Sequence, residues 1–270
     1  MKNTIKRMEK RGEKKEARSK RGQVTIFIIV AVVIVALAVL IYMFYPKIKS
    51  AVGISPKSPS DFMQLCIQDE LKSSIEKVSL QGGSLNPQNY VLYNDAKVEY
   101  LCYTDEYYKQ CVMQQPMLKA HVEEEIKNAI KNKETECLQS LKSSYERQGY
   151  VVTSKKGESV VELLPRRVVL SFNNSLTLEK QGTETYKELT VTLNNNLYEH
   201  VIIATSILNW EARYGDSETT TYMDYYPDLK VEKQLQTDGT KDYILTNRDK
   251  GNKFQFASRS VAWPSGYTGG

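Results

Sequence analysis

An uninterrupted apolar run near the N-terminus constrains this chain more than any other feature. The 22 residues from Val24 to Tyr45 include no charged residue, no Gly and no Pro. As a helix, this run measures roughly 33 Å, against roughly 30 Å for the hydrocarbon core of a bilayer. A core helix of a soluble domain would show a polar stripe, whereas Thr25 is the only polar residue before the terminal tyrosines. The sequence therefore predicts a transmembrane helix over residues 23–45, with the part from 24 to 45 in contact with lipid.

Charge is distributed unevenly on the two sides of this run. Residues 1–22 hold ten Lys or Arg and three Glu, a net charge of +7, whereas the other 248 residues hold 27 basic and 29 acidic side chains, a net charge of −2. Because basic flanks stay on the cytoplasmic side, we expect a single-pass protein of the cell membrane with residues 1–22 inside and residues 46–270 outside. The basic segment is expected to meet anionic lipid headgroups, and the slightly acidic remainder argues against nucleic-acid binding.

A processing motif lies where the basic segment meets the apolar run. The sequence Lys20-Arg21-Gly22-Gln23-Val24-Thr25-Ile26-Phe27 resembles the class III signal of archaeal type IV pilin-like proteins. The resemblance implies cleavage by a prepilin peptidase between Gly22 and Gln23, and self-assembly through the apolar helix. Two features depart from that family: Phe27 stands where many pilins carry Glu, and Pro46 ends the helix. The same stretch resembles the start of uncharacterised membrane-anchored surface proteins of archaea, for which the resemblance implies location and no activity.

The residues after the span predict a short stalk followed by one folded domain. Residues 46–61 are rich in Pro and Ser, which favours an extended linker. Residues 62–263 predict an extracytoplasmic α+β domain of amphipathic helices and antiparallel hairpins, large enough for its own core. Residues 264–270 are expected to form a flexible tail.

Three amphipathic helices are predicted within this domain. The first begins near a cap at Ser58 or Ser60 and ends before Gly82, with Leu65, Cys66 and Leu71 on its inner face. The second extends from Pro116 to about Gln148, and its run of charged residues is expected to form a solvated face. The third extends from Leu193 to a stop at Gly215. Period-two patterns predict strands at 150–152, 160–163, 168–172, 176–178, 189–193, 230–236, 242–246 and 254–263.

All four cysteines lie on the C-terminal side of the apolar run. An even number of exported cysteines predicts two disulfides, for which three pairings exist. We favour Cys102 with Cys111, which are close in sequence, and Cys66 with Cys137, which lie on the apolar faces of two helices. Four buried thiols and a four-thiolate metal site are the alternatives, and the lack of closely spaced cysteine pairs disfavours the metal site.

Asn173 begins the sequon Asn173-Asn174-Ser175, so it is a candidate glycosylation site on the exported side.

Motifs for catalysis are absent from the sequence. There is no G-x-S-x-G, no P-loop, no G-x-G-x-x-G and no H-E-x-x-H, so we predict no enzyme, no metal and no cofactor. His121 and His200, the two histidines, are expected at a surface or in a groove. Tyrosines around Cys102 and at positions 222, 225 and 226 either pack the core or stack on a sugar or a protein partner.

These features predict a membrane-anchored cell-surface protein with a disulfide-stabilised domain in a binding or structural role. Two alternatives stay open. One is a pilin-like subunit processed at Gly22. The other is a membrane-tethered extracytoplasmic hydrolase whose site is assembled from scattered acidic, tyrosine and histidine side chains.

Overall fold

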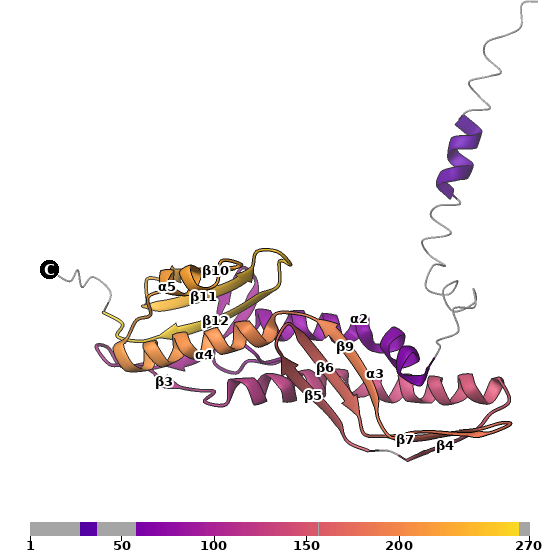
Figure 1. Ribbon diagram of the computed structural model, residues 1–270. Helices are drawn as coiled ribbons and strands as arrows, with labels where there is room; N and C mark the ends of the chain where they lie inside the picture. The colour runs from indigo at the N-terminus through magenta and orange to yellow at the C-terminus, as the bar shows by residue number, and fades with distance from the viewer. Residues whose placement is uncertain (1–27, 37–57, 156, 265–270) are drawn as a thin grey trace, which may run out of the picture. The chain divides into compact units, whose positions relative to one another are not determined.

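The computed structural model describes residues 28–36, 58–155 and 157–264, and the chain divides after residue 55 into two units (Figure 1). Residues 28–36 are helical with exposed side chains. Within the described ranges, no helix combines the length and the apolarity that crossing a bilayer requires. Most of the predicted span at 23–45 lies outside these ranges, as do the basic segment, the site at Gly22 and Gln23, stalk residues 46–57 and tail residues 265–270.

The described residues of the C-terminal unit form four helices: α2 (Pro59–Leu80), α3 (Leu118–Arg147), α4 (Leu197–Tyr214) and the short α5 (Thr220–Tyr225). Helix α2 begins at Pro59 because the Ser58 hydroxyl accepts a hydrogen bond of 3.1 Å from the Asp61 N–H and proline is pre-set for the first turn. Helix α4 ends at Gly215, whose φ of 81° is the left-handed conformation that commonly terminates a helix. Figure 1 shows α2 and α3 side by side, and they pack on each other.

The strands in the described part of this mixed α+β unit form three sheets. The largest has the order β1 (Tyr90–Tyr93), β2 (Ala96–Tyr103), β12 (Lys253–Arg259), β11 (Thr240–Asn247) and β10 (Leu229–Leu235), with β3 (Val112–Met113) paired to β2. A second joins β5 (Ser159–Leu164), β6 (Arg167–Phe172) and β9 (Leu189–Asn194). A third joins β4 (Val151–Lys155), β7 (Ser175–Glu179) and β8 (Thr183–Tyr186). Strand pairing is antiparallel except between β2 and β12, which are parallel with a register shift at Ala257 and Ser258.

One large core joins the helices to the sheets. Helix α2 contacts β9 and β12, α3 contacts β5, and α4 packs on β12. On the inner side of α3, six of the seven predicted apolar positions are buried and Tyr145 is half-buried; the buried ones are Leu118, Val122, Ile126, Ile130, Cys137 and Leu141. A smaller cluster of Val98, Tyr100 and Ala257 is buried on the largest sheet.

Several sequence predictions about the helices are wrong in detail. Leu65 is 53% exposed, and Met63 and Ile67 occupy the inner face of α2 instead. Leu193 belongs to β9, so the third helix begins four residues later, at Leu197. The charged face of α3 is not simply solvated, because the carboxylates of Glu123 and Glu125 accept hydrogen bonds of 2.7 Å from the backbone N–H groups of Leu163 and Leu85.

Two disulfides cross-link this unit, one between distant segments and one across a short loop. Cys66 of α2 is bonded to Cys137 of α3, with a Cα–Cα distance of 5.8 Å, and Cys102 is bonded to Cys111 across 5.3 Å. The favoured pairing is confirmed, and the thiol and four-thiolate alternatives are wrong because all four cysteines of the chain are used.

Candidate binding pocket

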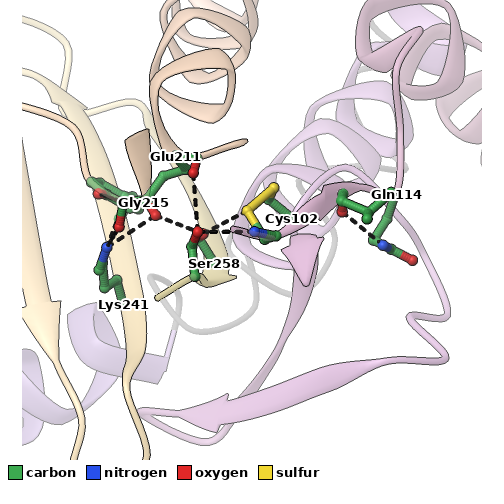
Figure 2. Close-up of a disulfide and its surroundings, with 10 residues drawn as sticks. Cys102, Gln114, Glu211, Gly215, Lys241 and Ser258 are labelled. Carbon is green, nitrogen blue, oxygen red and sulfur yellow. Dashed lines mark hydrogen bonds and ion pairs between the residues drawn. A yellow bond between two sulfur atoms is a disulfide. The ribbon is translucent and has the colours of Figure 1, made fainter. Parts of the chain in front are cut away.

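The candidate site is built around a buried carboxylate at the end of α4. Glu211 is fully buried, and it lies on the face of α4 that packs against β11 and β12. Its oxygens accept hydrogen bonds from Lys241 Nζ at 3.0 and 3.1 Å, from Ser258 Oγ at 3.2 Å and from the Tyr243 hydroxyl. Figure 2 shows Glu211 and Ser258 pointing toward each other beside the disulfide of Cys102, with Lys241 reaching the carbonyl of Gly215.

Burial and the hydrogen-bond pattern act in opposite directions on the ionisation of this carboxyl group. Burial raises the pKa of Glu211 above its ordinary value, and the Lys241 ammonium and the Tyr243 hydrogen bond offset only part of this rise. Burial and the adjacent Glu211 also raise the pKa of Tyr243, so its hydroxyl stays protonated. Because lysine and hydroxyl groups can all donate, the arrangement suits an ionised Glu211 that only accepts.

A second acid continues this network toward the surface. Lys241 Nζ lies 3.1 Å from Asp216, whose two oxygens also accept bonds of 3.0 Å from Lys233 Nζ. Partial burial raises the pKa of Asp216, but the hydrogen bond from Lys233 and the charge of Lys241 outweigh it and hold the pKa below its ordinary value. Two lysines and two carboxylates therefore neutralise each other.

Residues 260–264, which we name the strap, follow β12 and close one side of the site. The Cys111 N–H donates to Ser260 Oγ at 2.9 Å, and Ser260 Oγ donates to the Glu211 carbonyl at 3.0 Å. The Val261 N–H donates to the Lys109 carbonyl at 2.7 Å. Thus the strap connects the Cys102–Cys111 loop to the end of α4.

The strap adopts a strained backbone at the site. Val261 has a φ of +50°, which is unusual for a β-branched residue. Two glycines make room for it. A Cβ on Gly215 would lie 2.0 Å from Val261 Cγ2, and one on Gly239 would lie 2.4 Å from Ala262 Cβ. This conformation of the strap therefore requires glycine at both positions.

A cavity of about 540 Å³ opens between these parts. Its walls come from the end of α4, the β10–β11 hairpin and the strap, and they include the side chains of Asp216, Lys233 and Lys241. Its volume falls within the usual range for small-molecule sites.

Exposed aromatic rings stand at this cavity. Tyr214 is 55% exposed and Trp263 is 47% exposed, and both belong to the lining. Each extends into an aromatic pair, because the Tyr214 ring lies 4.9 Å from that of Trp210 and the Trp263 ring lies 4.7 Å from that of Tyr108. Leu235, also exposed, adds an aliphatic surface.

The two histidines lie away from this cavity's walls. His200 is 2% exposed on α4, its Nδ1 has no hydrogen-bond partner, and burial lowers its pKa to about 4. The expectation of a surface or groove position is therefore wrong for His200, which faces the core of the unit.

His121 belongs to a second polar cluster. The buried Ser84 hydroxyl lies 2.8 Å from His121 Nε2 and bonds to the Glu99 carboxylate. Burial raises the pKa of Glu99, the Ser84 hydrogen bond lowers it, and the charge of Glu125 raises it further. This arrangement differs from a catalytic triad because the acid contacts the serine rather than the imidazole.

The other predicted site residues are separate from the pocket. Asn173 is exposed between β6 and β7, so its side chain is accessible. The Tyr222 hydroxyl lies 2.8 Å from Ser206 Oγ, whereas Tyr225 and Tyr226 are exposed at α5. Within the residues that the structure describes, no group of three metal-ligating side chains converges.

Comparisons with known proteins found no match that could assign a function to this site. The chain matches no known protein family, and no curated protein and no solved structure shows significant similarity to it.

Proposed function

We propose that this chain is a single-pass, membrane-anchored cell-surface protein whose disulfide-stabilised α+β domain binds a ligand in the cavity beside α4. The observation that carries the proposal is the presence of all four cysteines in two disulfides, since such bonds persist in oxidising compartments. Both bonds lie on the C-terminal side of the apolar run, where the basic flank directs the chain outward.

The composition of the N-terminal region supports the anchor. Its described part, residues 28–36, is a helix of Ile, Val and Ala with exposed side chains. A helix that is apolar on every side is suited to lipid or to another apolar surrounding.

The chemistry of the pocket favours binding over hydrolysis. Glycoside hydrolysis, for example, needs one carboxyl group that is protonated and reaches the substrate. Glu211 is buried behind Lys241 with both oxygens engaged, and ion pairs keep Asp216 in its charged form. Neither group is suited to give a proton to a ligand. We therefore infer that the ion-pair network of Glu211 and Asp216 holds the cavity walls in place.

Protease treatment of intact cells tests the proposed topology. We expect an externally added protease to remove the domain from residue 56 onward while the N-terminal fragment stays in the membrane fraction. A domain that is digested only after the cells are opened would contradict the proposal.

A second candidate, a pilin-like subunit, is favoured by the β-branched, apolar helix at residues 28–36 and by the motif at Gly22 and Gln23. Mature protein found only in filament fractions would favour this candidate. A protein that stays monomeric in membranes with residues 1–22 attached would count against it.

A further inference from the structure

We infer that the cavity between α4, the β10–β11 hairpin and the strap binds a neutral carbohydrate of one or two pyranose rings. The inference rests on the proposed binding function and specifies its ligand. Three properties of the walls carry it: their charge balance, their exposed aromatic rings and their fixed hydrogen-bonding groups.

The charge balance favours a ligand without net charge. Lys233 and Lys241 both contact Asp216, and Lys241 also contacts Glu211. An anionic ligand would have to compete with these carboxylates for the same lysines. A cationic ligand would have to compete with the lysines for the carboxylates, whereas a neutral ligand avoids both competitions.

The exposed rings supply a surface for the apolar faces of a sugar. Pyranoses present C–H groups on their faces, and these pack on the faces of tyrosine and tryptophan rings. Tyr214 and Trp263 line the cavity while about half of each side chain remains exposed, with the Arg213 guanidinium over the Tyr214 ring at 5.2 Å. Such rings contribute a large contact area with little loss of side-chain entropy.

Acceptor oxygens beside the rings match sugar hydroxyls, because the Asp216 carboxylate and the Gln236 amide both line the cavity. The Lys233 ammonium uses its three N–H donors on the two Asp216 oxygens and the Ser217 carbonyl, each at 3.0 Å, so it fixes the position of the Asp216 carboxylate. Gln236, which also lines the cavity, donates through its Nε2 to Asp242, and its amide oxygen is an acceptor. A purely apolar ligand would remove water from these polar groups without replacing its hydrogen bonds, which disfavours it.

Tryptophan fluorescence of the full-length chain in lipid nanodiscs tests this inference. The chain has two tryptophans, so Trp210→Phe leaves Trp263 as the sole reporter. Alkyl maltoside detergents must be exchanged away beforehand because they carry the proposed ligand class. The probes are maltose, cellobiose, lactose and diacetylchitobiose, with inorganic phosphate as the anion and indole as the apolar compound.

We expect at least one neutral disaccharide to change the Trp263 emission in a saturable way, and phosphate to leave it unchanged. Adding Tyr214→Ala should weaken that binding about tenfold through the lost ring contact. Adding Tyr225→Ala instead, which removes an exposed ring outside the cavity, should leave the affinity unchanged.

The outcomes separate this inference from the proposed function. Saturable binding of phosphate or indole with no response to any disaccharide overturns the carbohydrate inference and leaves a binding pocket in place. No response to any probe, together with no binding in ligand-observed NMR, overturns both. A disaccharide response that Tyr214→Ala does not weaken also overturns the assignment to this cavity.

Discussion

At the scale of single residues, the pocket depends on backbone that only glycine allows. Gly215 ends α4 with a φ of +81° and faces Val261, which itself has a positive φ. Any side chain at Gly215 would displace the strap, because the neighbouring atom is closer than a Cβ can approach.

Replacing Gly215 with alanine should therefore destabilise the domain more than its backbone angle alone explains. Gly251→Ala is the matched control, since Gly251 has a φ of +70° and open space around it. Both variants incur a left-handed backbone cost of about 1 kcal/mol. We expect Gly215→Ala to lose about 2 kcal/mol more in chemical denaturation, from overpacking. Equal losses would contradict the close contact with Val261.

His200 should make the stability of the domain depend on pH. Its pKa falls from 6.5 to about 4 on burial, so the unfolded chain binds a proton that the folded chain does not. Stability should therefore decrease as the pH falls from about 6.5 to about 4, by about 3 kcal/mol. Denaturation curves of the wild type and of His200→Leu should diverge over this range. Parallel curves would show that His200 is not buried in its neutral form.

At the scale of elements, the Glu211 network joins the end of α4 to β11 and β12. Glu211→Ala removes the buried partner of Lys241, and we expect a loss of about 3–5 kcal/mol in the free energy of unfolding. The matched control is Glu76→Ala in α2, whose partner Lys72 lies 4.0 Å away at an exposed surface, with an expected loss below about 1 kcal/mol. Similar losses in both variants would contradict a structural role for the buried pair.

Helices and strands were predictable from the sequence where a single periodicity of apolar residues dominated. The i, i+4 spacing of Val122, Ile126 and Ile130 predicts α3 correctly, and the Asp238-Gly239 turn predicts the β10–β11 hairpin. Strand β8 and helix α5 have mostly polar or exposed side chains, so no apolar period marks them. The parallel pairing of β2 with β12 joins segments about 150 residues apart, and neither strand encodes its partner.

The sequence does contain a pattern that indicates the buried network of Glu211 and Lys241. Glu211 stands three and four residues after Leu208 and Ile207, so it shares the apolar face of α4. Lys241, Tyr243 and Leu245 are spaced two residues apart along β11, so they lie on the same face of the strand. A charged residue in each of two inward-facing patterns indicates a buried ion pair, but the pairing itself becomes visible only when the helix packs on the sheet.

At the scale of the whole molecule, the pocket combines parts that the sequence keeps apart. The end of α4, the β10–β11 hairpin and the strap are separated by helix α5 and strand β12. The composition of each part is ordinary, so only the fold identifies the cavity. The disulfides, in contrast, were predictable because Cys66 and Cys137 occupy one side of two packed helices and Cys102 and Cys111 bracket a short loop.

The central claim is that a disulfide-bonded domain is carried outside the cell on a membrane anchor. The most direct test is the intact mass of the full-length protein, isolated from its native membrane and alkylated without reduction. We predict a membrane-bound protein with no alkylated cysteine, and its mass also shows whether residues 1–22 have been removed between Gly22 and Gln23. Four alkylated thiols would contradict the account, because a reduced chain would be incompatible with an exported domain built on these two bonds.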